Sequence, residues 1–137
     1  MKTWQQKFDN GKSAQVKTLE KPFGGYPVGA QMYISTPREI DNFIRGLNAG
    51  EIVSVAQMRT ELATKANTEF TCALTTGIFL RVVAERAFEQ YQEGAESKPE
   101  NTITPFWRVV DPSSKLAEKL SFDKQFITEM RNCEKST

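Results

Sequence analysis

The stretch that decides the fold of this chain reads Ile103-Thr104-Pro105-Phe106-Trp107-Arg108-Val109-Val110. Proline disfavours helical backbone angles at the preceding residue, so the segment from Thr104 to Val110 is predicted to be extended. In a strand, alternate side chains point to opposite faces, which would place one aromatic ring in the core and the next at an interface. Neither Phe106 nor Trp107 can act as a nucleophile, because a phenyl ring has no reactive lone pair and indole is a hydrogen-bond donor only. The stretch therefore predicts packing or binding, without covalent chemistry.

Two helices with clear N-terminal signals precede this stretch. Thr36 is a favourable N-cap for a helix over 37–47, which begins with proline and has apolar residues at the spacing i, i+3, i+4, i+7. Ser54 is the corresponding cap of a second helix over 55–64. Ahead of both, residues 31–35 are predicted to form a short strand or an extended lead-in.

A third and longer helix is predicted after a turn over 65–69. Thr71 is its expected cap, it runs to about Gln92, and its broad apolar surface is typical of a central helix. Gly77 inside this helix costs about 1 kcal/mol relative to alanine, and we interpret it as permitting close packing or the close approach of a backbone. A polar loop over 94–102 then leads to the deciding stretch.

The chain beyond the deciding stretch is predicted to return to helix. Residues 116–120 are predicted to be either a returning strand or a short helix. A last helix is expected over 121–132, with its apolar residues on one side, and the tail over 133–137 is expected to be frayed.

Residues 1–31 are polar and interrupted by glycine and proline, and they are predicted to form an irregular arm with room for one short helix. The cluster of glycine and proline over 21–29 is predicted to be loop. Four aromatic residues would either pin the arm to the body or stack on a ligand: Trp4, Phe8, Phe23 and Tyr26. The predicted organisation is therefore one α+β, mostly helical fold, with the arm over 1–31 packed on a body over 32–137.

Composition excludes most enzyme classes. The chain has no histidine, which rules out every Ser-His or Cys-His nucleophile and every His-ligated metal site. Its carboxylates show no ligand spacing, so we expect neither a metal nor a cofactor. The two cysteines, Cys72 and Cys133, are too few for a disulfide framework and are interpreted as reduced thiols. With no apolar run of about 18 residues and no apolar signal core, the chain is expected to be cytoplasmic and not membrane-bound.

Charge is nearly balanced, at +1 for the whole chain, but it is unevenly distributed. Residues 1–23 carry five lysines against two carboxylates, whereas residues 53–90 carry four cations against four carboxylates. Duplex DNA binding draws most of its affinity from phosphate neutralisation. The neutral 53–90 segment therefore argues against strong DNA binding.

The deciding stretch resembles the reactive-site segment Pro-Cys-His-Arg-Val of the O6-alkylguanine-DNA alkyltransferases. Pro105, Arg108 and Val109 match that segment. Phe106 stands in the place of the cysteine that accepts the alkyl group, and Trp107 in that of the histidine that helps to ionise it. The predicted helices before the stretch also follow the order of that family.

A closer resemblance is to a group of alkyltransferase-like proteins. These proteins carry Thr-Thr-Gly-Ile-Phe and Thr-Pro-aromatic-Trp-Arg, as residues 75–79 and 104–108 do here. The likeness also takes in residues 4–21, so it spans most of the chain.

The resemblance implies a winged helix-turn-helix domain that binds double-stranded DNA and lacks alkyl transfer. It further implies that alkylated guanine is recognised in a pocket formed by Pro105, Phe106 and Trp107, and that a repair protein is recruited. Arg108 resembles the arginine that holds loops together in the family. Packing in the core is the alternative role of the two aromatic residues.

The start of the third helix offers further candidate contacts. Exposed donors at a helix N-terminus suit a phosphate. The candidates are Thr71, Thr75, Thr76 and the amides around Gly77. Capping and packing are the alternative roles of these residues.

Two other functions stay open. A protein- or ligand-binding module on the same scaffold is favoured because Leu74 or Thr75 stands where the family has a groove arginine, and Val55 where it has a tyrosine. That module predicts an exposed apolar patch around the two aromatic residues of the deciding stretch. An alkyl-transferring enzyme would have to use Cys72, whose thiol pKa a helix N-terminus can lower, although packing is its alternative role.

Overall fold

The computed structural model describes residues 3–94 and 103–135. Its elements are, in chain order, α1 (Trp4–Phe8), β1 (Gln15–Thr18), β2 (Gln31–Ile34), α2 (Pro37–Arg45), α3 (Val55–Lys65), β3 (Phe70–Thr71), α4 (Ala73–Glu93), the 3₁₀ turn η1 (Phe106–Arg108), α6 (Lys115–Lys119) and α7 (Gln125–Lys135). The chain is an α+β protein in which helices predominate, as predicted. Within the described ranges, no helix is both long and apolar enough to cross a membrane. The polar loop predicted over 94–102 lies outside the described residues, except for Gly94.

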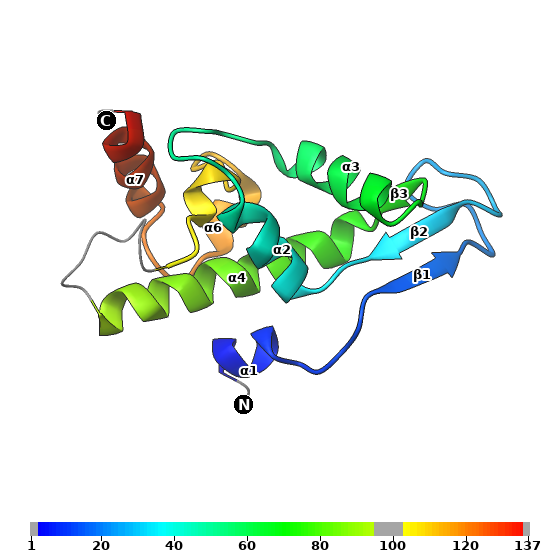
Figure 1. Ribbon diagram of the computed structural model, residues 1–137, viewed down its shortest axis with the longest axis horizontal. Helices are drawn as coiled ribbons and strands as arrows, with labels where there is room; N and C mark the ends of the chain where they lie inside the picture. The colour runs from blue at the N-terminus through cyan, green and yellow to red at the C-terminus, as the bar shows by residue number, and fades with distance from the viewer. Residues whose placement is uncertain (1–2, 95–102, 136–137) are drawn as a thin grey trace.

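The longest helix, α4, is the centre of the fold (Figure 1). Helices α1 and α2 both pack against it, and η1 contacts it from the C-terminal part of the chain. Leu80, Val83, Ala84 and Ala87 on its inner face are each at most 1% exposed. Residues at this spacing share one face of a helix, so α4 supplies one continuous wall of the core.

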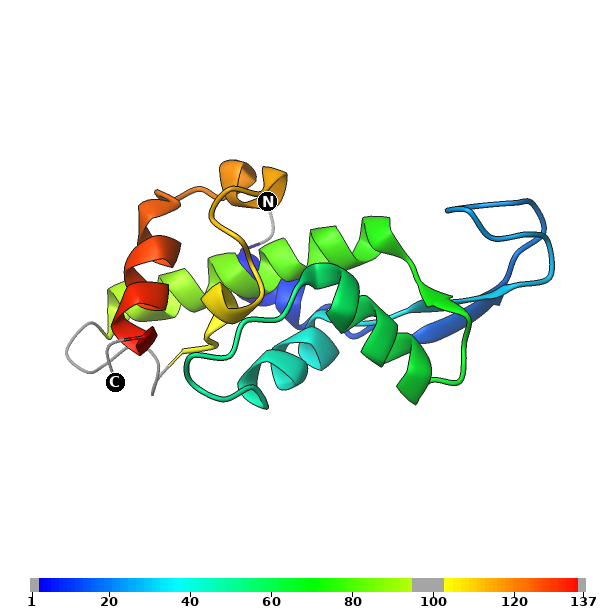
Figure 2. The ribbon, with the colours of Figure 1, turned by 90° about the horizontal axis from the view of Figure 1, so that it is seen from above.

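A three-stranded sheet lies at one end of the molecule, and α7 lies at the opposite end (Figures 1 and 2). Strand β1 pairs antiparallel with β2, which places Gln15 opposite Ile34. Strand β2 pairs parallel with β3, which places Met32 opposite Phe70. The sheet therefore joins the N-terminal segment, through β2, to the strand that leads into α4.

The prediction of an irregular arm is wrong for β1, whose pairing with β2 joins residues 1–31 to the body. All four β1 residues are exposed, so no alternation of apolar and polar residues marks the strand. The short helix for which the arm had room is α1, and Phe8 at its end is buried. The loop predicted over 21–29 is confirmed, and a bridge between Phe23 and Tyr26 tightens it.

The two predicted helix starts at Thr36 and Ser54 are confirmed. The hydroxyl oxygen of Thr36 accepts a hydrogen bond from the Glu39 amide at 3.2 Å, and that of Ser54 accepts one from the Gln57 amide at 3.0 Å. Each bond satisfies one amide that the first helical turn leaves without an intrahelical partner. These caps fix where α2 and α3 begin.

The deciding stretch is not a strand, because residues 106–108 form the 3₁₀ turn η1. The amides of Val109 and Val110 both donate to the carbonyl oxygen of Phe106, at 3.0 and 2.9 Å. Every residue from 103 to 110 is buried, so the predicted alternation between core and surface is also wrong. Successive side chains of a 3₁₀ turn point in different directions, and they are all buried here because both α4 and α7 pack against η1.

The C-terminal segment contains the helices α6 and α7, and α7 begins at Gln125 rather than at the predicted position 121. Of the two alternatives for residues 116–120, the short helix is confirmed as α6. The prediction of a frayed tail is wrong for residues 133–135, which belong to α7. Glu134 in the last turn is buried and bonded to Arg108, and this long-range pair holds the helix end in place.

Candidate functional site

The predicted pocket residues lie inside the core. Phe106 and Trp107 are both 0% exposed, with their ring centroids 5.5 Å apart, and Pro105 is buried beside them. The rings of Phe122 and Phe126 lie 5.7 and 5.9 Å from that of Phe106. The structure thus has a packed aromatic cluster where the sequence predicted a pocket, because η1 turns both rings inward. A ligand would reach these rings only after both had left the core.

The guanidinium of Arg108 joins three segments of the chain. Its Nη2 donates to the carboxylate of Glu134 at 2.6 Å, and its Nη1 donates to the carbonyl oxygen of Leu47 at 2.8 Å. The same carboxylate accepts a hydrogen bond from the Gly50 amide at 3.1 Å. Burial alone would raise the pKa of Glu134, but the hydrogen bonds from Arg108 and Gly50 outweigh it and hold that pKa below its ordinary value. Arg108 is therefore engaged within the protein.

Thr71, predicted to cap the third helix, lies instead in β3. Parallel pairing with Tyr33 keeps it extended, and Cys72 takes the N-cap position without a side-chain hydrogen bond. The Thr71 hydroxyl donates to the carbonyl oxygen of Arg59 at 2.8 Å. The predicted cap is therefore wrong, and Thr71 is a buried link between β3 and α3.

The other phosphate candidates differ in exposure. Thr76 is buried and its hydroxyl donates to the carbonyl oxygen of Cys72 at 2.7 Å, while Thr75 and Gly77 are partly exposed. The thiol of Cys72, which alkyl transfer would require, is itself buried. Of this group, only Thr75 and Gly77 reach the surface near the start of α4.

An exposed apolar surface lies along the first turns of α4. There, a groove of about 500 Å³ runs over α4 between α1 and α6, and we call it the α4 groove. Its lining comprises Trp4, Lys7, Ala73, Leu74, Gly77, Ile78, Arg81, Val82, Leu116 and Lys119. Three helices from distant parts of the sequence thus build one surface.

Leu74 and Ile78 project from the floor of the α4 groove. They are 68% and 53% exposed, although both are large aliphatic side chains. With Gly77 and Arg81 they follow the spacing i, i+3, i+4, i+7 and so form one line along α4. The sequence predicted a broad apolar surface typical of a central helix, and the part of that surface formed by Leu74 and Ile78 is exposed. The sequence does indicate that part of the helix is exposed, because apolar residues occupy more of the circumference of α4 than one core can cover.

Gly77 leaves the helix backbone bare in the middle of the groove. A Cβ built at this position would meet no atom within 4 Å, so nothing in the described chain requires a glycine here. Its φ angle is not positive, so its backbone conformation is one that any residue can adopt. The close packing that the sequence suggested is therefore not made by any described residue, which leaves this stretch of backbone open to the close approach of another molecule.

The rim of the α4 groove is positively charged. Lys7 from α1, Arg81 from α4 and Lys119 from α6 line it, and no carboxylate lies in its lining. The Arg81 guanidinium pairs with Glu85, outside the lining, at 3.5 Å, so the two lysines supply the excess of positive charge. The Lys7 ammonium lies 4.3 Å from the Trp4 ring centroid and the Arg81 guanidinium 5.4 Å from it, distances at which a cation is attracted to an indole face. These contacts fix the position of the Trp4 ring relative to the charged groups of Lys7 and Arg81.

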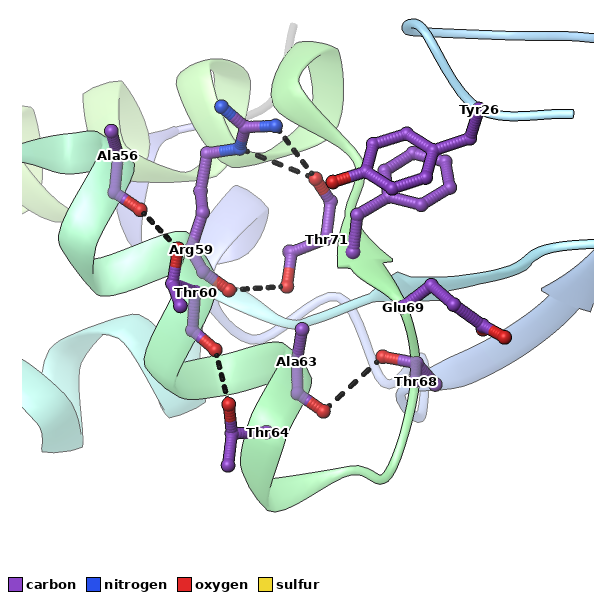
Figure 3. A pocket seen from close by; sticks show the side chains of 10 residues that line it. Tyr26, Ala56, Arg59, Thr60, Ala63, Thr64, Thr68, Glu69 and Thr71 are labelled. Carbon is purple, nitrogen blue, oxygen red and sulfur yellow. Dashed lines mark hydrogen bonds between the residues drawn. The ribbon is translucent and has the colours of Figure 1, made fainter.

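A second hollow, of about 290 Å³, lies between α3, β3 and the loop over 21–29 (Figure 3). Tyr26 closes one side by stacking on Phe70, with ring centroids 4.0 Å apart. Arg59 points across it and donates two hydrogen bonds to the carbonyl oxygen of Thr71, at 3.1 and 3.2 Å (Figure 3). The Arg59 guanidinium in this hollow is therefore already hydrogen-bonded within the protein.

The α4 groove presents apolar side chains and cations. Its ionisable groups are two ammonium groups and one guanidinium, so it contains neither a thiol nor a carboxylate to act as a nucleophile or base. In the described residues, no three side chains of histidine, cysteine, aspartate or glutamate are grouped to hold a metal ion. Comparison with protein-family models, curated proteins and solved structures found no match to this chain.

Proposed function

We propose that this chain is a non-enzymatic binding module whose interface is the α4 groove. The exposure of Leu74 and Ile78 side by side is the observation that carries the proposal. Single exposed aliphatic residues are ordinary on protein surfaces, whereas contiguous ones bordered by polar groups mark interaction sites. The sequence analysis offered a protein- or ligand-binding module as an alternative and expected its surface around Phe106 and Trp107. We propose the α4 groove as that surface instead.

The energy available at these two residues is sufficient for specific binding. Burying a large aliphatic side chain completely is worth about 1.5–3 kcal/mol. Scaled to the exposed fractions of 68% and 53%, covering both would contribute about 2–4 kcal/mol. That energy corresponds to roughly 30-fold to several hundred-fold in affinity, before any contribution from the rim.

A site-specific crosslinking experiment tests the proposal. A photoreactive phenylalanine derivative replaces Ile78 in one protein and Val16 in another, because Val16 is equally exposed, at 50%, on β1 at the far end of the sheet. In extracts of the native host, we expect a discrete adduct from position 78 that is absent from position 16 and that Leu74→Gln abolishes. Equal labelling from both positions, or labelling that Leu74→Gln leaves unchanged, would refute the proposal.

Double-stranded DNA binding, in the manner of alkyltransferase-like proteins that recruit a repair protein, is a second candidate function. The observation that favours it is the position of Lys7 and Lys119, two cations outside the neutral 53–90 segment, beside the start of α4. In this proposal α3, the turn after it and α4 are the helix-turn-helix of a winged-helix domain. A fluorescence anisotropy titration with an O6-methylguanine duplex and its unmodified control tests it. Absence of salt-dependent binding to either duplex at micromolar protein would rule it out.

A further inference from the structure

The shape of the α4 groove limits what it can accept. Its floor runs from Ala73 to Val82, a rise of about 14 Å at 1.5 Å per residue, with α1 and α6 as its two walls. Two aliphatic side chains stand up from this floor and leave bare backbone between them at Gly77. Such a surface offers side-chain contacts over two to three helical turns, which is the length over which an amphipathic helix presents residues i, i+3, i+4 and i+7.

The charges around the groove limit the partner further. Lys7 on α1 and Lys119 on α6 stand on the two walls, whereas Arg81 stands on α4 itself, so a helix laid along α4 would pass between the two lysines and over Arg81. The N-terminus of α4 adds to this positive potential, because Cys72 supplies no capping side chain to its first amides. A partner that carries acidic residues beside an apolar stripe would match both features, whereas a basic one would be repelled.

We infer that the α4 groove binds an amphipathic helix of a partner protein, whose apolar stripe covers Leu74 and Ile78 and whose flanking carboxylates face Lys7, Arg81 and Lys119. The inference rests on the proposed function and names the partner of the same site.

Two other occupants fit less well. A second copy of this chain, related by twofold symmetry, would bring Lys7, Arg81 and Lys119 against the same three cations. Duplex DNA would satisfy the cations, but it would place a charged, hydrated backbone over Leu74 and Ile78. Burial of apolar side chains against phosphates gains nothing.

Selection from a displayed peptide library tests the identity of the partner. The library consists of helices of about 16 residues, or roughly 24 Å, with aliphatic residues at i, i+3, i+4 and i+7 and with Glu, Gln or Lys allowed equally at the flanking positions. Wild-type protein is the bait, and the Leu74→Gln/Ile78→Gln variant is the counter-selection. We expect selected helices to carry Glu over Lys at the flanks.

The selected peptide is then measured against charge variants. Reversal of two rim cations in Lys7→Glu/Lys119→Glu is expected to raise Kd about tenfold or more at low salt, and a peptide with Lys at the flanks should recover much of the loss. Lys17→Glu/Lys12→Glu changes the net charge equally at residues outside the groove and should leave Kd unchanged. Circular dichroism of each variant shows that its helix content is intact.

The outcomes separate the two proposals. Helices that need Leu74 and Ile78 but show no preference for Glu would overturn the acidic partner and leave the α4 groove as an interface. A duplex that binds wild type but not the Leu74→Gln/Ile78→Gln variant would also overturn it, in favour of nucleic acid. Failure to select any helix that depends on these two residues, together with no adduct from position 78, would overturn both.

Discussion

Replacement of Gly77 by alanine should make the protein more stable and its interface worse. The added Cβ meets no atom within 4 Å, and the residue has ordinary helical angles, so the methyl group enters open space. Glycine in the interior of a helix costs about 0.5–1 kcal/mol relative to alanine, mainly through the entropy of the unfolded chain. We therefore expect Gly77→Ala to raise the free energy of unfolding by about 0.5–1 kcal/mol.

A second glycine provides a matched contrast of opposite sign. Gly50 has φ +86°, a conformation in which a Cβ costs roughly 1–2 kcal/mol. Gly50→Ala is thus expected to lower the free energy of unfolding by about 1 kcal/mol, even though its Cβ would meet only the Glu134 carbonyl oxygen at 3.8 Å. The same chemical change should therefore stabilise in α4 and destabilise in the α2–α3 loop.

Urea unfolding monitored by far-ultraviolet circular dichroism measures both effects. In thermal unfolding of a chain of this length, the same gain of 1 kcal/mol should raise Tm by about 3–5 °C. The peptide selected on the α4 groove should bind Gly77→Ala more weakly than wild type, because the methyl group occupies the point of closest approach. A loss of stability in Gly77→Ala would refute the reasoning, since it would mean that the fold itself requires this glycine.

Four further outcomes follow from the core and the groove. Glu134→Gln should cost about 3–5 kcal/mol of unfolding free energy in urea, because it leaves the buried guanidinium of Arg108 without its charge partner. Since the folded state holds the pKa of Glu134 below its ordinary 4.5, the stability from this pair is complete above that value and is lost as pH falls through the folded pKa. Urea midpoints should thus fall more steeply in acid for wild type than for Glu134→Gln. Phe106→Ala should cost about 3–5 kcal/mol, as for other large buried aromatic residues, and a cost below 1 kcal/mol would contradict the aromatic cluster. Leu74→Gln/Ile78→Gln should change the unfolding free energy by less than about 1 kcal/mol, because both side chains are already in water.

The helix starts could be predicted from the sequence because their signals are local. Thr36 and Ser54 each bond to an amide three residues further along, so the residues that decide the structure are adjacent in the chain. Strand β1 had no such signal. Its place depends on pairing with β2, about fifteen residues away, and its own side chains are all exposed. The cap at Thr71 failed for the same reason, since pairing with Tyr33 outweighs the preference of threonine for a helix N-cap.

The sequence left two roles open for the aromatic pair, a pocket and packing in the core, and both side chains are buried. Phe106 and Trp107 attract attention because they occupy positions of a reactive pair, but large aromatic residues also gain most from burial. The sequence does not say which of these applies, because the answer depends on Phe122 and Phe126 in a later segment. Leu74 and Ile78 were missed for the complementary reason. An apolar side chain on a helix predicts core by default, and only the arrangement of α1 and α6 shows that nothing in the described chain covers it.

The two segments on which the sequence-based expectation of an alkyltransferase-like protein rested differ in what the fold explains. In residues 104–108 every side chain is buried, and packing together with the Arg108–Glu134 pair accounts for the identity of the residues. In residues 75–79 packing accounts for Thr76, which is buried and bonded, but not for Gly77 or Ile78. The partner that we propose would account for a bare helical backbone beside an exposed isoleucine. If the resemblance reflects a shared function, that function should follow the α4 groove, and exchange of residues 75–79 should alter binding where exchange of residues 104–108 alters only stability.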